Sequence, residues 1–206
     1  METPGYRGAV MEYIRSNAFP REKFSHQPRL YRLACHLGAG TSFDDDILFA
    51  AAWMHDLGVF VGHRPEDPAE LASWDHLAYA LRVVPGILTK AGFPEEKIPG
   101  VLEAIRTHLP LGEPTTPEAV LLRDADILEQ LGAVGVLRTV CKIGRDTRFT
   151  TFPDALRSLH RAVEQLPAQL KTPAARSLAE PRIALLRRFL ASAEAEGVIA
   201  EPECGM

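Results

Sequence analysis

Nearly the whole sequence has the hydrophobic spacing of amphipathic helices, with apolar residues recurring every three to four positions. No stretch alternates apolar and polar residues as a half-buried strand does, and proline and glycine clusters separate the periodic segments. We therefore predict an all-α helical bundle. The expected helices are at about residues 6–17, 28–38, 44–56, 68–92, 97–108, 117–131, 133–142, 153–166 and 174–195.

Length and composition favour one domain over residues 1–206. The chain has 206 residues, of which 46% are hydrophobic, and no long polar or Gly/Ser-rich stretch divides it. The last predicted helix, residues 174–195, carries an apolar stripe that suits packing on the core or on a second copy of the chain in a homodimer. We expect core packing. The stripe consists of Leu178, Ile183, Leu185, Leu186, Phe189 and Leu190.

Charge and cysteine content restrict the partners and the compartment. A net charge of −4 gives no general attraction to a nucleic acid polymer or an anionic membrane, so a phosphorylated partner is expected to be small. The three cysteines are odd in number and unpaired in spacing, which favours a reducing compartment. With no secretory leader pattern and no bilayer-length apolar stretch, we expect a cytoplasmic protein.

The segment from Asp44 to Gly58 places two metal-capable side chains at the end of an apolar helix. Three aspartates begin it, as favours a helix N-terminus, and Gly58 is expected to end it in the left-handed conformation. His55 follows Ala51 by four residues, so its imidazole is expected on the buried face. A His-Asp pair alone is more often structural than functional, but a buried imidazole needs a partner.

Other histidines and aspartates recur at similar places. His26 begins a predicted helix, His76 lies near the start of another, and His108 ends a third on its inward face. Asp124 and Asp126 interrupt the apolar stripe of the helix at 117–131. Each alone has an ordinary structural explanation, whereas together they indicate a metal site. Imidazole with carboxylate, in the absence of paired cysteines, suits manganese, iron, nickel, cobalt or zinc.

Four motifs in this order resemble the HD-domain superfamily of metal-dependent phosphohydrolases, in its branch of small bacterial hydrolases. They are His-x-x-Arg-Leu-Tyr-Arg-Leu-Ala at 26–34, Ala-Ala-Ala-Trp-Met-His-Asp-Leu-Gly at 50–58, Ala-Ile-Arg-Thr-His at 104–108, and the segment 121–136 with Asp-Ala-Asp before Gly-Ala-Val-Gly. The resemblance covers about residues 20–165, which we expect to form the core of a single HD-type domain.

This resemblance implies one or two divalent metal ions. The primary ligands it implies are His26, His55, Asp56 and one of Asp124 and Asp126. Helical projection favours Asp124, whereas the Ala-Asp-x-Leu pattern of the superfamily favours Asp126, which we prefer. His76 and His108 match positions that hold a second ion or contact phosphate. Before His26, where many relatives have an aspartate or histidine, the chain has Arg21-Glu22-Lys23; Glu22 is an alternative outer ligand, although a solvated charge is the simpler interpretation.

The implied activity is hydrolysis of a small phosphoester or phosphoanhydride, for which we expect a nucleotide, by metal-activated water. Asp56 and Asp126 are the expected catalytic carboxylates and Arg138 the expected stabiliser of phosphoryl charge. Lys142 and Arg29 are candidate further substrate contacts, although a solvated basic charge is the simpler interpretation of each. The first alternative is an HD-type di-iron oxygenase acting on a small polyol or phosphonate. The second, a non-catalytic regulatory module, is disfavoured because no expected ligand is plainly missing.

Overall fold

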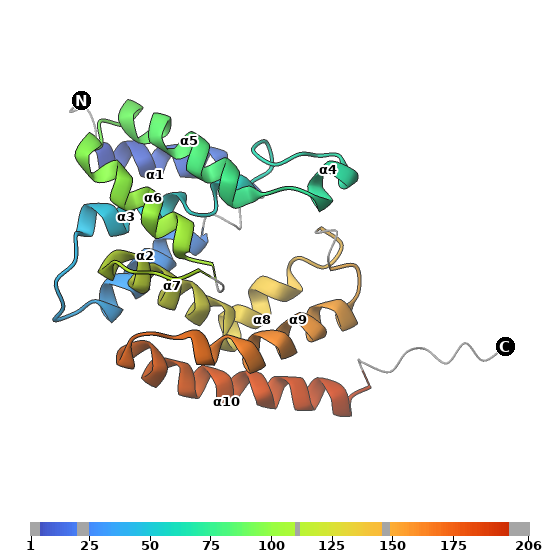
Figure 1. The fold of residues 1–206 in the computed structure, drawn as a ribbon. Helices are drawn as coiled ribbons and strands as arrows, with labels where there is room; N and C mark the ends of the chain where they lie inside the picture. Colours follow the sequence, from blue (N-terminus) through green and yellow to red (C-terminus); the bar gives the residue numbers. More distant parts are fainter. Residues whose placement is uncertain (1–4, 20–24, 110–111, 146–148, 198–206) are drawn as a thin grey trace. The chain divides into compact units, whose positions relative to one another are not determined.

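The computed structural model describes residues 5–19, 25–109, 112–145 and 149–197. Within these residues the chain forms α-helices and short 3₁₀ turns, and the β structure is limited to one isolated bridge between Val61 and Arg64 (Figure 1). The predicted all-α fold is therefore confirmed. In this part of the chain, no helix is both long and apolar enough to cross a membrane.

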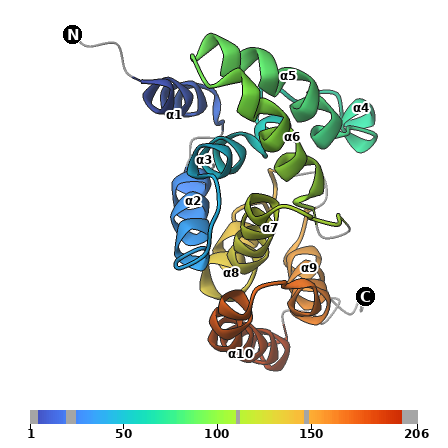
Figure 2. The same ribbon diagram turned by 60° about the vertical axis from the view of Figure 1, so that its left-hand side comes forward.

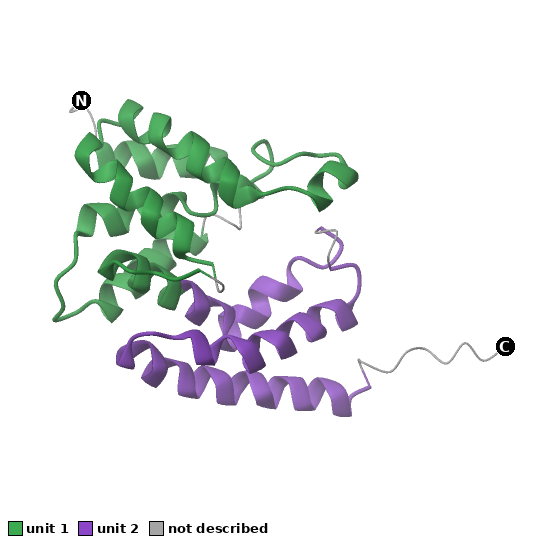
Figure 3. Ribbon diagram, viewed as in Figure 1, with its two compact units in different colours: residues 1–125 green, residues 126–206 purple. Residues whose placement is uncertain are grey.

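The chain divides into two compact units, residues 1–125 and 126–206, with the boundary inside helix α7 (Figure 3). The first unit contains α1 (Tyr6–Asn17), α2 (His26–Leu37), α3 (Asp45–Met54), the 3₁₀ turn η2 (Leu57–Val59), α4 (Pro68–Ala72), α5 (His76–Lys90), the 3₁₀ turn η3 (Glu95–Lys97), α6 (Ile98–Thr107) and most of α7 (Pro117–Gln130). That the chain is one domain stays a prediction from its length and composition.

Helix α3 is the centre of the first unit. All seven residues from Leu48 to Met54 are buried, because α2, α6, α1 and α5 pack around this helix (Figure 2). Such complete burial matches its uninterrupted apolar sequence. The side chains that α3 carries at its end are thereby placed in the interior of the unit.

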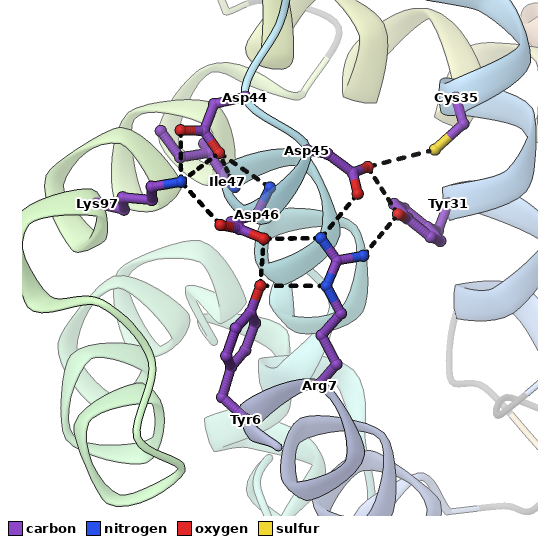
Figure 4. Close-up of polar contacts among 9 residues, drawn as sticks. All are labelled: Tyr6, Arg7, Tyr31, Cys35, Asp44, Asp45, Asp46, Ile47 and Lys97. Atoms are coloured by element: carbon purple, nitrogen blue, oxygen red, sulfur yellow. Dashed lines mark hydrogen bonds and ion pairs between the residues drawn. The ribbon is translucent and has the colours of Figure 1, made fainter.

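The N-terminal end of α3 is fixed by a network of charges (Figure 4). The Asp44 side chain accepts hydrogen bonds from the backbone N–H groups of Asp46 (2.9 Å) and Ile47 (3.2 Å), as predicted for this end of the helix. Arg7 of α1 pairs with Asp45 and Asp46 at 2.7 Å each. The network therefore anchors α3 to α1 at the end opposite His55.

Two details of the predicted helices were wrong. The expected helix 68–92 is broken into α4 and α5, because the Asp75 side chain caps α5 by accepting the N–H of Ala78 at 2.9 Å. Gly58 does not adopt a positive φ; α3 ends at Met54, and Gly58 lies in η2. Glycine is required at position 58 because a side chain there would collide with the backbone of His76.

The second unit consists of the end of α7, α8 (Gly132–Val140), α9 (Phe152–Gln165), the 3₁₀ turn η4 (Pro167–Gln169) and α10 (Pro173–Ala195). Helix α10 packs on α8 and α9. Leu186 and Leu190 of its predicted stripe are buried, whereas Leu185 is exposed. Gly132, the first residue of α8, has a φ of +71°, a left-handed conformation that glycine adopts without strain.

Candidate metal centre

Two histidines of the first unit, His55 and His108, occupy equivalent positions at the ends of their helices. His55 follows α3 and His108 follows α6, each as the C-terminal cap of its helix. The Nδ1 atom of His55 lies 3.0 Å from the carbonyl oxygen of Ala52, and that of His108 lies 2.6 Å from the carbonyl oxygen of Ile105. Because a carbonyl only accepts, each Nδ1 carries the proton, and a neutral ring then presents Nε2 with a bare lone pair.

Three side chains converge around the Nε2 atom of His55. This atom lies 3.3 Å from Nε2 of His26, the first residue of α2, and 3.4 Å from Oδ2 of Asp56. His26 Nε2 and Asp56 Oδ2 lie 3.7 Å apart. His26 and His55 are 5% and 0% exposed, while the Asp56 side chain is 22% exposed. The carboxylate is therefore the member of this group most open to solvent.

The donor set fits a divalent metal. Ligand atoms bound about 2.0–2.2 Å from one ion lie roughly 3.0–3.5 Å from one another, close to the separations among His26, His55 and Asp56. A buried lone pair beside a carboxylate is stabilised by a positive charge between them. Two imidazoles with one carboxylate suit zinc, manganese, iron, nickel or cobalt.

The other four expected ligands lie outside this group. Among the described residues, one cluster of three or more such side chains has its ligand atoms mutually within 4.8 Å, and it consists of His26, His55 and Asp56. The His108 ring is nevertheless in edge-on contact with His55, with centroids 5.0 Å apart. His76 is the first residue of α5 and is partly exposed. The roles of Asp124, Asp126, His76 and His108 stay predictions.

Asp124 and Asp126 have different surroundings. Asp124 is completely buried and belongs to the first unit, as do the histidines. Asp126 belongs to the second unit, where its carboxylate lies 3.7 Å from Nη1 of Arg138 and accepts a hydrogen bond from Gln130 at 3.1 Å. Residues two positions apart on a helix point to nearly opposite sides, so the two carboxylates face different environments.

The expected substrate-binding cations also have contacts within the protein. Arg138 lies beside the carboxylates of Asp126 and Glu129, the latter at 3.6 Å. Lys142 lies over the ring of Phe149, 5.3 Å from its centroid, and Arg29 donates to the Ser25 hydroxyl at 2.9 Å. These contacts leave the proposed substrate roles untested. Glu22, the alternative outer ligand, lies outside the described residues.

The sequence reasoning missed two side chains that hold the histidine-bearing helix ends. The indole Nε1 of Trp74 donates to the carbonyl oxygen of Gly58 at 2.8 Å. Arg123, 3% exposed, donates through Nη1 to the carbonyl oxygen of Gly112. No local pattern indicates either contact, because each joins residues that are more than ten positions apart. The only signal is that both glycines closely follow a histidine.

A family profile described as HD domain matches residues 24–131. These residues make up more than half of the chain and include His26, His55, Asp56, His108 and both aspartates of α7. The chain therefore belongs to the HD domain family, as its motifs predicted. A search of curated proteins gave no significant match.

Solved structures share the fold at low sequence identity. YpgQ from Bacillus subtilis is 22% identical, with a TM-score of 0.71 over 93% of this chain and 95% of that one. Another structure of YpgQ, in complex with ADP, gives 22% and 0.69 over 92% and 97%. An HD-superfamily hydrolase from Bacillus thuringiensis is 22% identical, with a TM-score of 0.65 over 93% and 95%. At these identities the likeness establishes the fold.

Proposed function

We propose that this HD-domain protein is a metal-dependent hydrolase of small phosphorylated substrates, with a nucleotide as the preferred class. The observation that carries the proposal is the convergence of His26, His55 and Asp56 in the interior of the first unit. A divalent metal bound there would supply Lewis-acid activation of water and of a phosphoryl oxygen.

The roles of the protein side chains follow from their surroundings. His55 is held in one tautomer by the Ala52 carbonyl, so its ligand atom is oriented before any metal arrives. Asp56 is the most exposed of the three, and its second carboxylate oxygen can accept a proton from an attacking water. His26 completes the set from a different helix, α2.

For the fourth ligand we propose Asp124, although the superfamily pattern favoured Asp126. Asp124 is fully buried and shares its unit with the three clustered residues, and a nearby cation stabilises a buried carboxylate. Asp126 already lies between Arg138 and Gln130. Loss of metal in Asp124→Asn but not in Asp126→Asn would support this choice.

Two arguments support a nucleotide substrate. The net charge of −4 gives no attraction to a polymer of phosphates, so recognition is expected to be local. A protein of the same fold, YpgQ, has been crystallised with ADP. We also propose that Arg138 contacts a phosphate group of the substrate. Its guanidinium lies beside the carboxylates of Asp126 and Glu129, and we expect these two contacts to be kept when substrate binds.

The test is a phosphate-release assay on the purified protein with manganese, cobalt, nickel, iron and zinc. The substrates are nucleoside mono-, di- and triphosphates, together with simple phosphomonoesters. Metal-dependent phosphate release that is lost in Asp56→Asn supports the proposal. No turnover with any metal, together with oxygen consumption by the iron-loaded protein on a polyol or phosphonate, would replace it with the oxygenase alternative.

A further inference from the structure

The turn directly after the clustered Asp56 is a short 3₁₀ helix, η2. The N–H of Val59 donates to the carbonyl oxygen of Asp56 at 3.0 Å, and the N–H of Phe60 donates to that of Leu57 at 3.3 Å. Two hydrogen bonds over so few residues make a weak element by themselves. Contacts from residues outside η2 are therefore expected to help fix the orientation of Asp56, which directly precedes the turn.

Gly58, in the middle of η2, is held from two sides. Its carbonyl oxygen accepts the indole N–H of Trp74 at 2.8 Å. Its Cα faces the backbone of His76 so closely that a methyl group there would collide with the His76 carbonyl oxygen. The middle of the turn is thus fixed between a side-chain donor and the first residue of α5.

Trp74 is itself well supported. Its ring packs on the ring of Tyr79, with centroids 5.2 Å apart, and the Tyr79 hydroxyl lies 2.9 Å from Nδ1 of His63. Asp75, the next residue, caps α5. Trp74 directly precedes the cap of α5 and packs on an aromatic ring, so its indole N–H can hold the Gly58 carbonyl in one position.

The same arrangement occurs after the other inward histidine. Four residues beyond His108, the carbonyl oxygen of Gly112 accepts the Nη1–H of buried Arg123, and a methyl group on Gly112 would collide with the Thr107 carbonyl oxygen. Each histidine-bearing helix end is therefore followed by a glycine that is packed against backbone and held by a side-chain donor.

We propose that Trp74 is a positioning residue of the candidate metal centre. Its indole N–H fixes η2 and, through η2, the angle at which Asp56 and His55 meet His26. Trp74 contacts neither substrate nor metal in this role. The inference rests on the proposed function, because it takes the cluster of His26, His55 and Asp56 to be the metal site.

The test compares Trp74→Phe with Tyr79→Phe. The first variant keeps an aromatic ring on Tyr79 but removes the donor to Gly58, whereas the second removes the hydrogen bond to His63 and leaves Gly58 untouched. Calorimetric titration with Mn²⁺ should show binding weakened about five-fold in Trp74→Phe, the effect of one hydrogen bond, and unchanged in Tyr79→Phe. In the metal-free protein, amide exchange at Val59 should accelerate only in Trp74→Phe.

Each outcome decides a different question. Absence of binding of every one of Mn²⁺, Co²⁺, Ni²⁺, Fe²⁺ and Zn²⁺ by the wild-type protein would overturn the proposed function, and the inference with it. Wild-type binding with equal affinity in Trp74→Phe, and unchanged exchange at Val59, would overturn the inference alone. Loss of the fold in both Trp74→Phe and Trp74→Tyr would also overturn it, because Trp74 would then be required for the whole unit rather than for the turn.

Discussion

The Nε2 atoms of His26 and His55 lie 3.3 Å apart in the interior of the first unit, although the two residues are 29 positions apart in the sequence. The Nδ1 proton of His55 is committed to Ala52, so the neutral ring can only accept at Nε2. A cation bound between the two rings and Asp56 would meet this Nε2 lone pair and the negative charge of the carboxylate. This geometry leads directly to the first prediction.

His55→Gln and Asp56→Asn should each weaken Mn²⁺ binding by more than about 100-fold, since each removes a proposed ligand rather than a supporting group. Calorimetry and elemental analysis of the purified protein measure the loss. His36→Ala is the matched control, because His36 lies exposed on the last turn of α2. Equal loss of metal in His36→Ala would show that the ligands have been misassigned.

The sequence indicates the residues of this cluster because His26 and His55 lie at the ends of strongly periodic helices and Asp56 directly follows His55. The spacing of apolar residues placed His55 on the inward side of its helix, and the structure buries it completely. The resemblance then singled out His26 and Asp56, from α2 and from the residue before η2. Helix type and inward direction are local properties, so a sequence pattern can carry them.

Contacts between distant segments could not be predicted in this way. The three aspartates at 44–46 predict a helix start, which the structure confirms. Nothing in their spacing indicates that Arg7 binds Asp45 and Asp46. Gly58 was read as a left-handed residue, whereas its requirement comes from the backbone of His76, 18 positions later. A glycine needed for close approach looks the same in sequence as one needed for its backbone conformation.

The packing at Gly58 gives the second prediction. Gly58→Ala should destabilise the protein by about 1–3 kcal/mol, because the added methyl group must displace the backbone of His76. Gly86→Ala is the control: Gly86 lies within α5 with open space around it, and alanine there should stabilise by about 0.5–1 kcal/mol. Urea denaturation of both variants measures the two changes in the free energy of unfolding, which should have opposite signs. A neutral or stabilising Gly58→Ala would contradict the packing argument.

The charged network at the start of α3 gives a pH prediction. Hydrogen bonds from Lys97, Tyr6 and Arg7 hold the pKa of Asp46 well below its ordinary value. A lowered folded-state pKa means that the unfolded chain takes up the proton first, so the contribution is complete near pH 7 and declines as the pH falls below about 5.

Asp46→Asn should therefore reduce the free energy of unfolding at pH 7 by about 1–2 kcal/mol, a modest value because the cluster is partly exposed to solvent. The difference between variant and wild type should shrink progressively as the pH is lowered from 5 to 3. Thermal unfolding of both proteins over this range provides the measurement. A difference that stays constant with pH would rule out the charge of Asp46 as its source.

The last prediction concerns Arg123, whose guanidinium lies in the interior one position before Asp124. Arg123→Lys keeps the charge but cannot reproduce the planar group that reaches the Gly112 carbonyl, so we expect a loss of about 1.5–3 kcal/mol and faster amide exchange at Gly112. Arg106→Lys is the matched control on α6, since Arg106 is exposed and pairs with Glu103 three residues earlier; its effect should stay within about 0.5 kcal/mol. Guanidinium titrations give both stabilities. If the two substitutions reduce the free energy of unfolding equally, the hydrogen bond from Arg123 to the Gly112 carbonyl does not carry the expected stabilisation.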